Sequence, residues 1–184
     1  MSRACWVSLL ILLLVGPQSV RGAADREVVY FFSLDTNPGW SVEGQWAWGQ
    51  PTGGGGEWGH TDPWSGHTGT NVFGYNLNGD YANSMPEYNL TTGALDFTGY
   101  SMVRLRFWRW LNVEEPAYDH AYVRISRDGV VWPTVWANHG EITDSSWTAV
   151  TIDISDIADE HQVYLRWTMG TTDYISPDPR VRHG

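Results

Sequence analysis

Apolar and polar residues alternate with a period of two through much of the second half of the chain. The longest such run is MVRLRFWRWLNV at residues 102–113. Similar runs follow at 119–126, 147–154 and 162–168. Successive side chains of a strand point to opposite faces, so each run predicts a β-strand with one buried face.

Shorter β-rich runs add further candidate strands. They lie at residues 28–32, 45–48, 71–74, 87–90 and 131–136. Asp128-Gly129 predicts a tight hairpin turn, and residues 156–160 predict one helical turn. Strands joined by turns, without a long helix, predict an all-β fold, namely an antiparallel β-sandwich of the jelly-roll type.

A segment rich in Trp, Gly, Pro and Asn runs from Trp46 to Asp80 and holds almost no aliphatic residues. Gly and Pro disfavour a helix interior, and the aromatic content is too high for an ordinary disordered linker. The segment predicts a long ordered loop system. Loops of this kind on a rigid scaffold are frequent binding sites.

The first 24 residues predict a secretory signal peptide. Arg3 supplies a positive charge, residues 5–15 (CWVSLLILLLV) are apolar, and small residues allow cleavage after Gly22 or Ala24. The apolar run is shorter than the roughly 20 residues of a membrane span, so we expect no stable membrane insertion after cleavage; an uncleaved anchor is the alternative. The expected organisation is a domain at 25–173 and an irregular tail at 174–184, in a secreted, extracellular protein.

Composition narrows the possible partners. The 184 residues include 11 basic and 21 acidic ones, with a net charge of −10. Signal cleavage would remove Arg3, Arg21 and the single cysteine, Cys5. The acidic balance argues against nucleic acid and anionic membranes as partners and suits a divalent cation. Most of the 12 tryptophans are expected in the core.

Acidic residues at turns predict a calcium site. Glu114, Glu115 and Asp119 lie where one strand ends and the next begins, and Asp62 and Asp80 lie in the loop-rich segment. Ca²⁺ binds several carboxylate and carbonyl oxygens that loops supply. We expect Glu115, Asp119, Asp62 and Asp80 as ligands of a structural Ca²⁺ ion. No run matches an EF-hand loop, and a solvated acidic turn is the alternative.

The residues that alternate with the aliphatic ones along the long strands, which we call the polar parity, predict a ligand-binding surface. Its members are Arg104, Arg106, Trp108, Trp110, Tyr122, Arg124 and Arg166. Brought together by neighbouring strands, they would form one aromatic and guanidinium face, on which sugar rings can stack while polar groups direct hydrogen bonds. In the alternative, arginine stems shield the rings, or the long loop covers this face and makes it a second core.

The sequence predicts no catalytic residue. It lacks the HExxH and GxSxG motifs and any Cys/His set with zinc spacing. The rival hypothesis is a glycosidase that uses Glu115 and Asp119 as paired carboxylates, which would have to lie about 5–10 Å apart in a cleft.

Four segments together resemble a known family: GWSVEGQWAWGQPTGGGGEWGHTDPWSG, TGTNVFGYNLNGDY, LRFWRWLNVE and YDHAYVRISRDGVVWPTVW. They are similar to the MAM-like, concanavalin-A-like jelly-roll domains of secreted bacterial proteins such as immune-inhibitor-A-type metallopeptidases. The resemblance covers about residues 32–170. It implies a non-catalytic accessory module with a glycan or an extracellular protein as its ligand, and bound calcium with Glu115 and Asp119 as ligands.

One departure from that family lies near the C-terminus. Its modules close with a further strand, whereas here Met169–Asp173 is followed by YISPDPRVRHG, which lacks alternation and paired aspartates. The resemblance therefore predicts a C-terminally truncated module. A remnant without a ligand, or a fragment of a secreted hydrolase, are the remaining alternatives.

Overall fold

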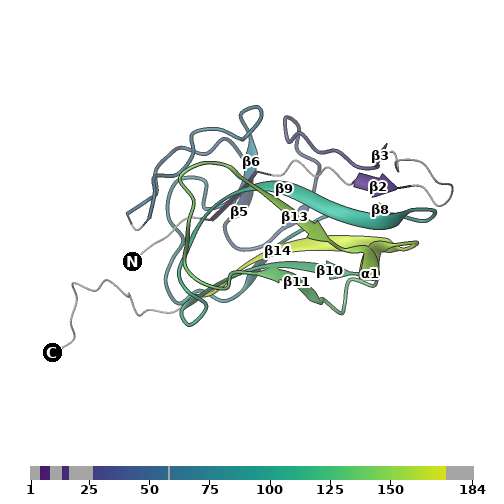
Figure 1. Cartoon of the computed structure of the whole chain (residues 1–184). Coiled ribbons are helices and arrows are strands. Elements are labelled where there is room, and N and C mark those ends of the chain that lie inside the picture. Colours follow the sequence, from purple (N-terminus) through teal and green to yellow (C-terminus); the bar gives the residue numbers. More distant parts are fainter. Residues whose placement is uncertain (1–4, 9–13, 17–26, 58, 173–184) are drawn as a thin grey trace.

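The protein folds as an all-β sandwich of two antiparallel sheets that pack face to face (Figure 1). The computed structural model describes residues 5–8, 14–16, 27–57 and 59–172. The fold class expected from the alternating pattern is confirmed. No helix within these described ranges is long and apolar enough to cross a membrane.

The first sheet has eight strands, in the order β3-β2-β9-β1-β6-β5, with β12 and β13 also paired to β9. Its strands are β1 (Cys5–Ser8), β2 (Leu14–Gly16), β3 (Glu27–Val28), β5 (Trp46–Gly49), β6 (Val72–Tyr75), β9 (Ser101–Val113), β12 (Ile142–Thr143) and β13 (Thr148–Asp153). The long β9 pairs with β13 along one edge and with β1 and β2 along the other.

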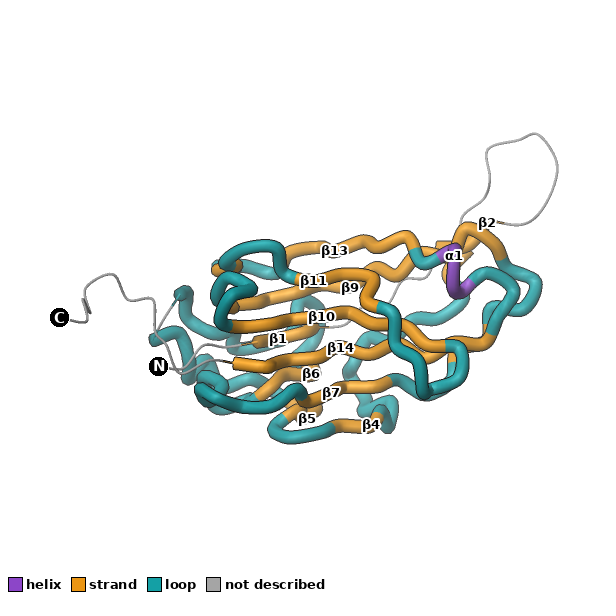
Figure 2. The backbone as a smooth tube through the Cα atoms, turned by 90° about the horizontal axis from the view of Figure 1, so that it is seen from below, coloured by secondary structure: helices purple, strands orange, loops and turns teal. Residues whose placement is uncertain are grey.

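The second sheet has six strands, in the order β11-β10-β14-β7-β4, with β8 also paired to β14. They are β4 (Ser41–Val42), β7 (Tyr88–Thr91), β8 (Leu95–Asp96), β10 (Asp119–Ser126), β11 (Thr134–Ala137) and β14 (Gln162–Thr172). The neighbouring strands β11, β10, β14, β7 and β4 can be followed side by side in Figure 2. The single helical turn, α1 (Ser155–Ala158), connects β13 to β14.

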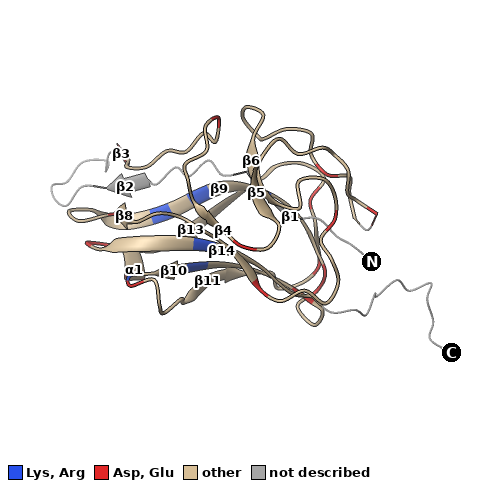
Figure 3. Ribbon diagram, turned by 180° about the vertical axis from the view of Figure 1, so that it is seen from behind, with Lys and Arg blue, Asp and Glu red and all other residues tan. Residues whose placement is uncertain are grey.

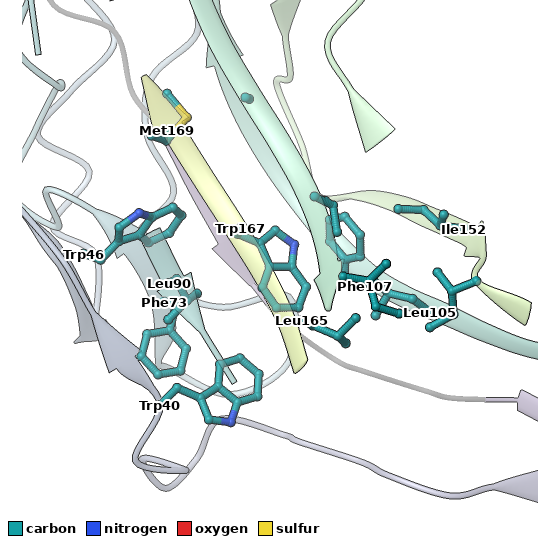
Figure 4. Packing of buried hydrophobic residues seen from close by; sticks show 14 of the residues in the cluster. Trp40, Trp46, Phe73, Leu90, Leu105, Phe107, Ile152, Leu165, Trp167 and Met169 are labelled. Atoms are coloured by element: carbon teal, nitrogen blue, oxygen red, sulfur yellow. The ribbon is translucent and has the colours of Figure 1, made fainter. Parts of the chain in front are cut away.

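The core lies between the sheets and contains the aliphatic residues of the alternating strands, as predicted from the sequence (Figure 4). Phe107 of β9 meets Trp167 of β14 edge to face, with ring centroids 5.6 Å apart. Trp40, from the segment before β4, stacks on Trp167 at 6.0 Å and on Phe73 of β6 at 5.1 Å. Aromatic rings therefore join the two layers. Among the tryptophans whose side chains the structure describes, Trp40, Trp46 and Trp167 are the buried ones, so fewer tryptophans lie in the core than expected.

Some element boundaries differ from the expectation. The run at 28–32 forms only the short β3, because Tyr30 and Phe32 pack their rings against the core rather than continuing a ladder. The strand expected at 131–136 begins at Thr134. The preceding loop is longer than a tight turn because Asp128 Oδ1 accepts hydrogen bonds from the amides of Val130 and Val131.

The two predicted terminal segments are mostly or wholly outside the described residues. Of the predicted signal peptide, residues 1–4, 9–13 and 17–24 lie outside them, and the described residues 5–8 and 14–16 form β1 and β2. The irregular tail expected at 174–184 lies outside them entirely.

Candidate functional site: the outer face of the six-stranded sheet

The structure does not bring the seven predicted binding residues onto one surface. Arg104, Arg106, Trp108 and Trp110 belong to β9 of the eight-stranded sheet, whereas Tyr122, Arg124 and Arg166 belong to β10 and β14 of the six-stranded sheet. For these seven residues the predicted parity holds, because none of them is buried while the aliphatic residues that alternate with them are. Two groups therefore face away from the core on opposite sides of the sandwich.

Loop residues cover much of the β9 group. The His67 ring stacks on Trp108 at a centroid distance of 3.6 Å. Trp110 packs against Trp147 at 5.7 Å and belongs to a small cluster centred on the buried Val72. This packing corresponds to the alternative in which the long loop turns this face into a second core.

The group on the six-stranded sheet is an ordered network at the sheet's outer face. The Arg124 guanidinium donates to both carboxylate oxygens of Glu87, at 2.7 and 2.8 Å. The same guanidinium lies 4.4 Å from the ring centroid of Tyr122. The His120 ring stacks on Tyr122, with the ring centroids 5.5 Å apart. These contacts hold the Tyr122 ring and Arg124 in a fixed relation.

A second arginine extends this surface on β14. Arg166 lies directly opposite Arg124 in the register of β10 and β14. Its guanidinium carbon is 3.6 Å from the ring centroid of Trp132, and its Nε donates to Thr91 Oγ1 at 3.0 Å. The Trp132 indole donates to the carbonyl of Gly129 at 3.0 Å. The hairpin loop thus brings an indole over the sheet. We call this surface the aromatic-arginine face; it consists of Glu87, Tyr122, Arg124, Trp132 and Arg166.

Burial and neighbouring charges shift the pKa values on this face. Burial raises the pKa of the Tyr122 phenol, and nearby Glu87 raises it further, so the hydroxyl stays protonated at neutral pH. The hydrogen bonds from Arg124 lower the pKa of Glu87. Burial lowers the pKa of Arg166, while Glu43 opposes this effect. The face therefore presents a neutral phenol and a paired carboxylate beside two guanidinium groups.

Figure 3 shows acidic positions gathered in the loops at one end of the sandwich. Of the predicted metal ligands, Asp62, Asp80 and Glu115 lie in loops, whereas Asp119 is the first residue of β10. Asp62, with 2% of its surface exposed, and Asp80 converge on Gly55. A side chain at Gly55 would overlap Asp62 Oδ2 and Asp80 Oδ1, so these two carboxylates would have to shift to admit it. Asp80 Oδ1 also accepts the amide of Gly56 at 2.8 Å. Two of the four expected ligands are thus adjacent.

The other two expected ligands differ from each other in burial. Asp119 is 3% exposed and accepts a hydrogen bond from the Tyr81 hydroxyl, whereas Glu115 is exposed. Glu114, which precedes Glu115, is the buried carboxylate of that turn. Asn138 ties this turn together by donating to the carbonyls of Glu114 and Asp119 at 2.9 and 3.1 Å. Among the described residues, no group of three or more His, Cys, Asp or Glu residues is placed to hold a metal ion.

Sequence reasoning missed two members of the aromatic-arginine face. Trp132 lies outside the alternating runs, in a hairpin loop, so parity gave no reason to place it beside Arg166. Glu87 lies just before β7, and its pairing with Arg124 requires the order β10-β14-β7. The signal in the sequence was an acidic residue at the start of a predicted strand, which could pair with an arginine of a neighbouring strand.

Fold and site together define a small all-β sandwich with an aromatic and guanidinium face on one sheet. The chain is similar to Bacillopeptidase F of Bacillus subtilis (strain 168), with 32% identity over 131 residues. The match covers 68% of this chain and 8% of that protein, so the chain spans only a small part of its relative. No family model and no solved structure matches the chain.

Proposed function

We propose that this chain is a non-catalytic accessory module of an exported, extracellular protein, and that its aromatic-arginine face binds carbohydrate. The match to a small part of a peptidase supports an accessory role, because the chain is an all-β piece that corresponds to 8% of that protein. The resemblance to MAM-like jelly-roll modules described above supports the same role. We also propose that the protein this module serves is a bacterial peptidase.

The observation that carries carbohydrate binding is the arrangement of Tyr122 and Trp132 around the paired arginines. The pyranose ring offers C–H faces that pack on aromatic rings, and its hydroxyls accept hydrogen bonds from guanidinium groups. Here Arg124 is held by Glu87 and Arg166 by Trp132 and Thr91. Polar groups that are fixed before a ligand arrives reduce the entropy lost on binding.

A glycan array tests this proposal. The labelled wild-type protein should bind a restricted set of glycans, and Trp132→Ala and Tyr122→Ala should lose that binding while keeping the wild-type circular dichroism spectrum. The matched control is Trp64→Ala, because Trp64 is 67% exposed and lies in the loop-rich segment rather than on this face. Equal loss in all three variants, or retention in the first two, would refute the proposed face.

A protein surface is the second candidate ligand, supported by the large exposed apolar residues near the hairpin, Val130 and Val131. A hydrolase built on Glu115 and Asp119 has less support. Glu115 is exposed, whereas Asp119 is buried beside Tyr81. A glycosidase pair needs both carboxyls to face one substrate.

A structural Ca²⁺ ion is a separate part of the proposal. Asp62 and Asp80 support such a site, because a carboxylate oxygen of each approaches the same position beside Gly55. Carboxylates of this kind are the ligands that Ca²⁺ takes, together with backbone carbonyls. Asp119, the first residue of β10, accepts a hydrogen bond from the hydroxyl of Tyr81, the residue that follows Asp80. When bound, the ion would neutralise buried carboxylate charge and tie the loops to the end of the sandwich.

A further inference from the structure

Strand β1 occupies an interior position in the eight-stranded sheet. It runs antiparallel to β6 on one side and to β9 on the other. The strands β6 and β9 therefore run parallel to each other, and their separation is two strand spacings, about 10 Å. That separation leaves room for one extended segment, so β1 connects two halves of the sheet that do not pair directly.

The register shows that the position held by β1 is adjacent to the core. Position 5 lies opposite Tyr75 of β6 and Leu111 of β9, and position 7 lies opposite Phe73. Tyr75, Leu111 and Phe73 are all buried members of the main hydrophobic cluster. Without a strand between them, β6 and β9 would expose these side chains and two rows of unpaired backbone groups.

The residues that fill this position are the same residues that the sequence predicts to be removed with the signal peptide. Cleavage after Gly22 or Ala24 would release both β1 and β2. We propose that the space between β6 and β9 is a strand-accepting slot. The chain's own residues 5–8 fill it while the signal peptide is attached, and an extended, alternately apolar segment of a partner protein fills it after cleavage.

The neighbouring strands define the chemistry of the segment that the slot accepts. It must be extended over at least four residues and run antiparallel to both β6 and β9, as β1 does. It must be apolar at the two positions opposite Tyr75 and Phe73, because these neighbours are buried. Main-chain hydrogen bonds on both sides would supply affinity, and the two apolar positions would supply selectivity, as in other cases of strand addition.

A peptide-binding experiment on the full chain tests the slot. Trp6→Pro removes a backbone donor from the middle of β1 and should empty the slot. The matched control is Ser19→Pro, which places a proline in the same predicted signal peptide but outside the strands that the structure describes. The probe is a fluorescent peptide of residues 3–10 that carries Cys5→Ser. It should bind Trp6→Pro saturably, and about a hundredfold more tightly than it binds the wild-type chain or Ser19→Pro, where the tethered strand competes at a millimolar effective concentration.

Equal affinity for all three chains, or no binding to Trp6→Pro, would overturn the proposal. If Trp6→Pro does not fold alone, the peptide is added during refolding: recovery of the folded state supports the slot, and failure to recover refutes it. Hydrogen exchange on the wild-type chain provides an independent check. The β6 amides directed away from β5 should exchange as slowly as those directed toward it, and rapid exchange there would contradict a filled slot.

Discussion

The guanidinium of Arg166 lies 3.6 Å from the ring centroid of Trp132, across the junction of β14 and the hairpin loop that precedes β11. This contact fixes an indole above a sheet whose neighbouring arginine, Arg124, is held by Glu87. Cation–π contacts of this type contribute about 0.5–2 kcal/mol, depending on burial. The contact therefore holds Trp132 and Arg166 in place, while the neighbouring Tyr122 stays partly exposed to solvent.

The pairing of Glu87 with Arg124 should make stability depend on pH. The folded-state pKa of Glu87 lies below its usual value of about 4.5. The pair therefore stabilises the fold above that pH, and this contribution is lost as the pH falls through the folded-state pKa. We expect Glu87→Gln to lower the free energy of unfolding by up to about 1 kcal/mol at pH 7, because the carboxylate is partly exposed. Urea unfolding at pH 7 and pH 3 checks this; the same difference at both values would contradict it.

Arg109 and Asp144 form a more buried ion pair, with side chains only 14% and 10% exposed. Asp144 Oδ2 accepts from Arg109 Nε at 2.8 Å and from the Leu111 amide at 3.0 Å. Asp144→Ala leaves a guanidinium buried without its partner and should cost about 3 kcal/mol. The matched control is Asp153→Ala in the exposed pair with Arg104, whose side chains are 44% and 61% exposed. Comparable losses of unfolding free energy in the two variants would refute this assignment.

Trp110 should act in folding rather than in ligand binding. Its ring packs on Trp147 and belongs to the small cluster with Val72. Trp110→Ala should lower the free energy of unfolding by about 2 kcal/mol, since the ring is half-buried. Glycan binding at temperatures where the variant is folded should be unchanged. If Trp110→Ala keeps the wild-type stability but loses glycan binding, the binding face lies on the eight-stranded sheet instead.

Ca²⁺ bound beside Gly55 should raise the melting temperature by mass action on the folded state. We expect the wild-type melting temperature to fall when EDTA is added and to recover with excess Ca²⁺. Asp62→Asn should melt at a lower temperature and show no response to EDTA. A wild-type melting temperature that EDTA leaves unchanged would refute the calcium site.

The sequence predicts much of the fold because its strongest signal is local. Alternation alone identified β9, β10, β13 and β14 and the parity that faces the core. It could not assign strands to sheets, since pairing depends on contacts between distant segments. For this reason Trp108 and Tyr122, which share the polar parity, were expected on one surface and lie on opposite faces of the sandwich.

The candidate site was predictable only in part. Tyr122, Arg124 and Arg166 follow from parity, but Trp132 reaches Arg166 through an irregular loop. Convergence of Asp62 and Asp80 depends on the turn at Gly55, which spacing along the chain does not reveal. Glu114 and Glu115 are adjacent in sequence, and only the end of β9 decides which of the two is buried.

Carbohydrate binding by the aromatic-arginine face is tested most directly by a calorimetric titration of Trp132→Ala with the glycan that the wild-type protein binds best on the array. We expect Trp132→Ala to bind this glycan about tenfold more weakly or worse, corresponding to at least about 1.4 kcal/mol, with a melting temperature close to that of Trp64→Ala. Wild-type affinity in Trp132→Ala would show that the aromatic-arginine face does not bind the glycan.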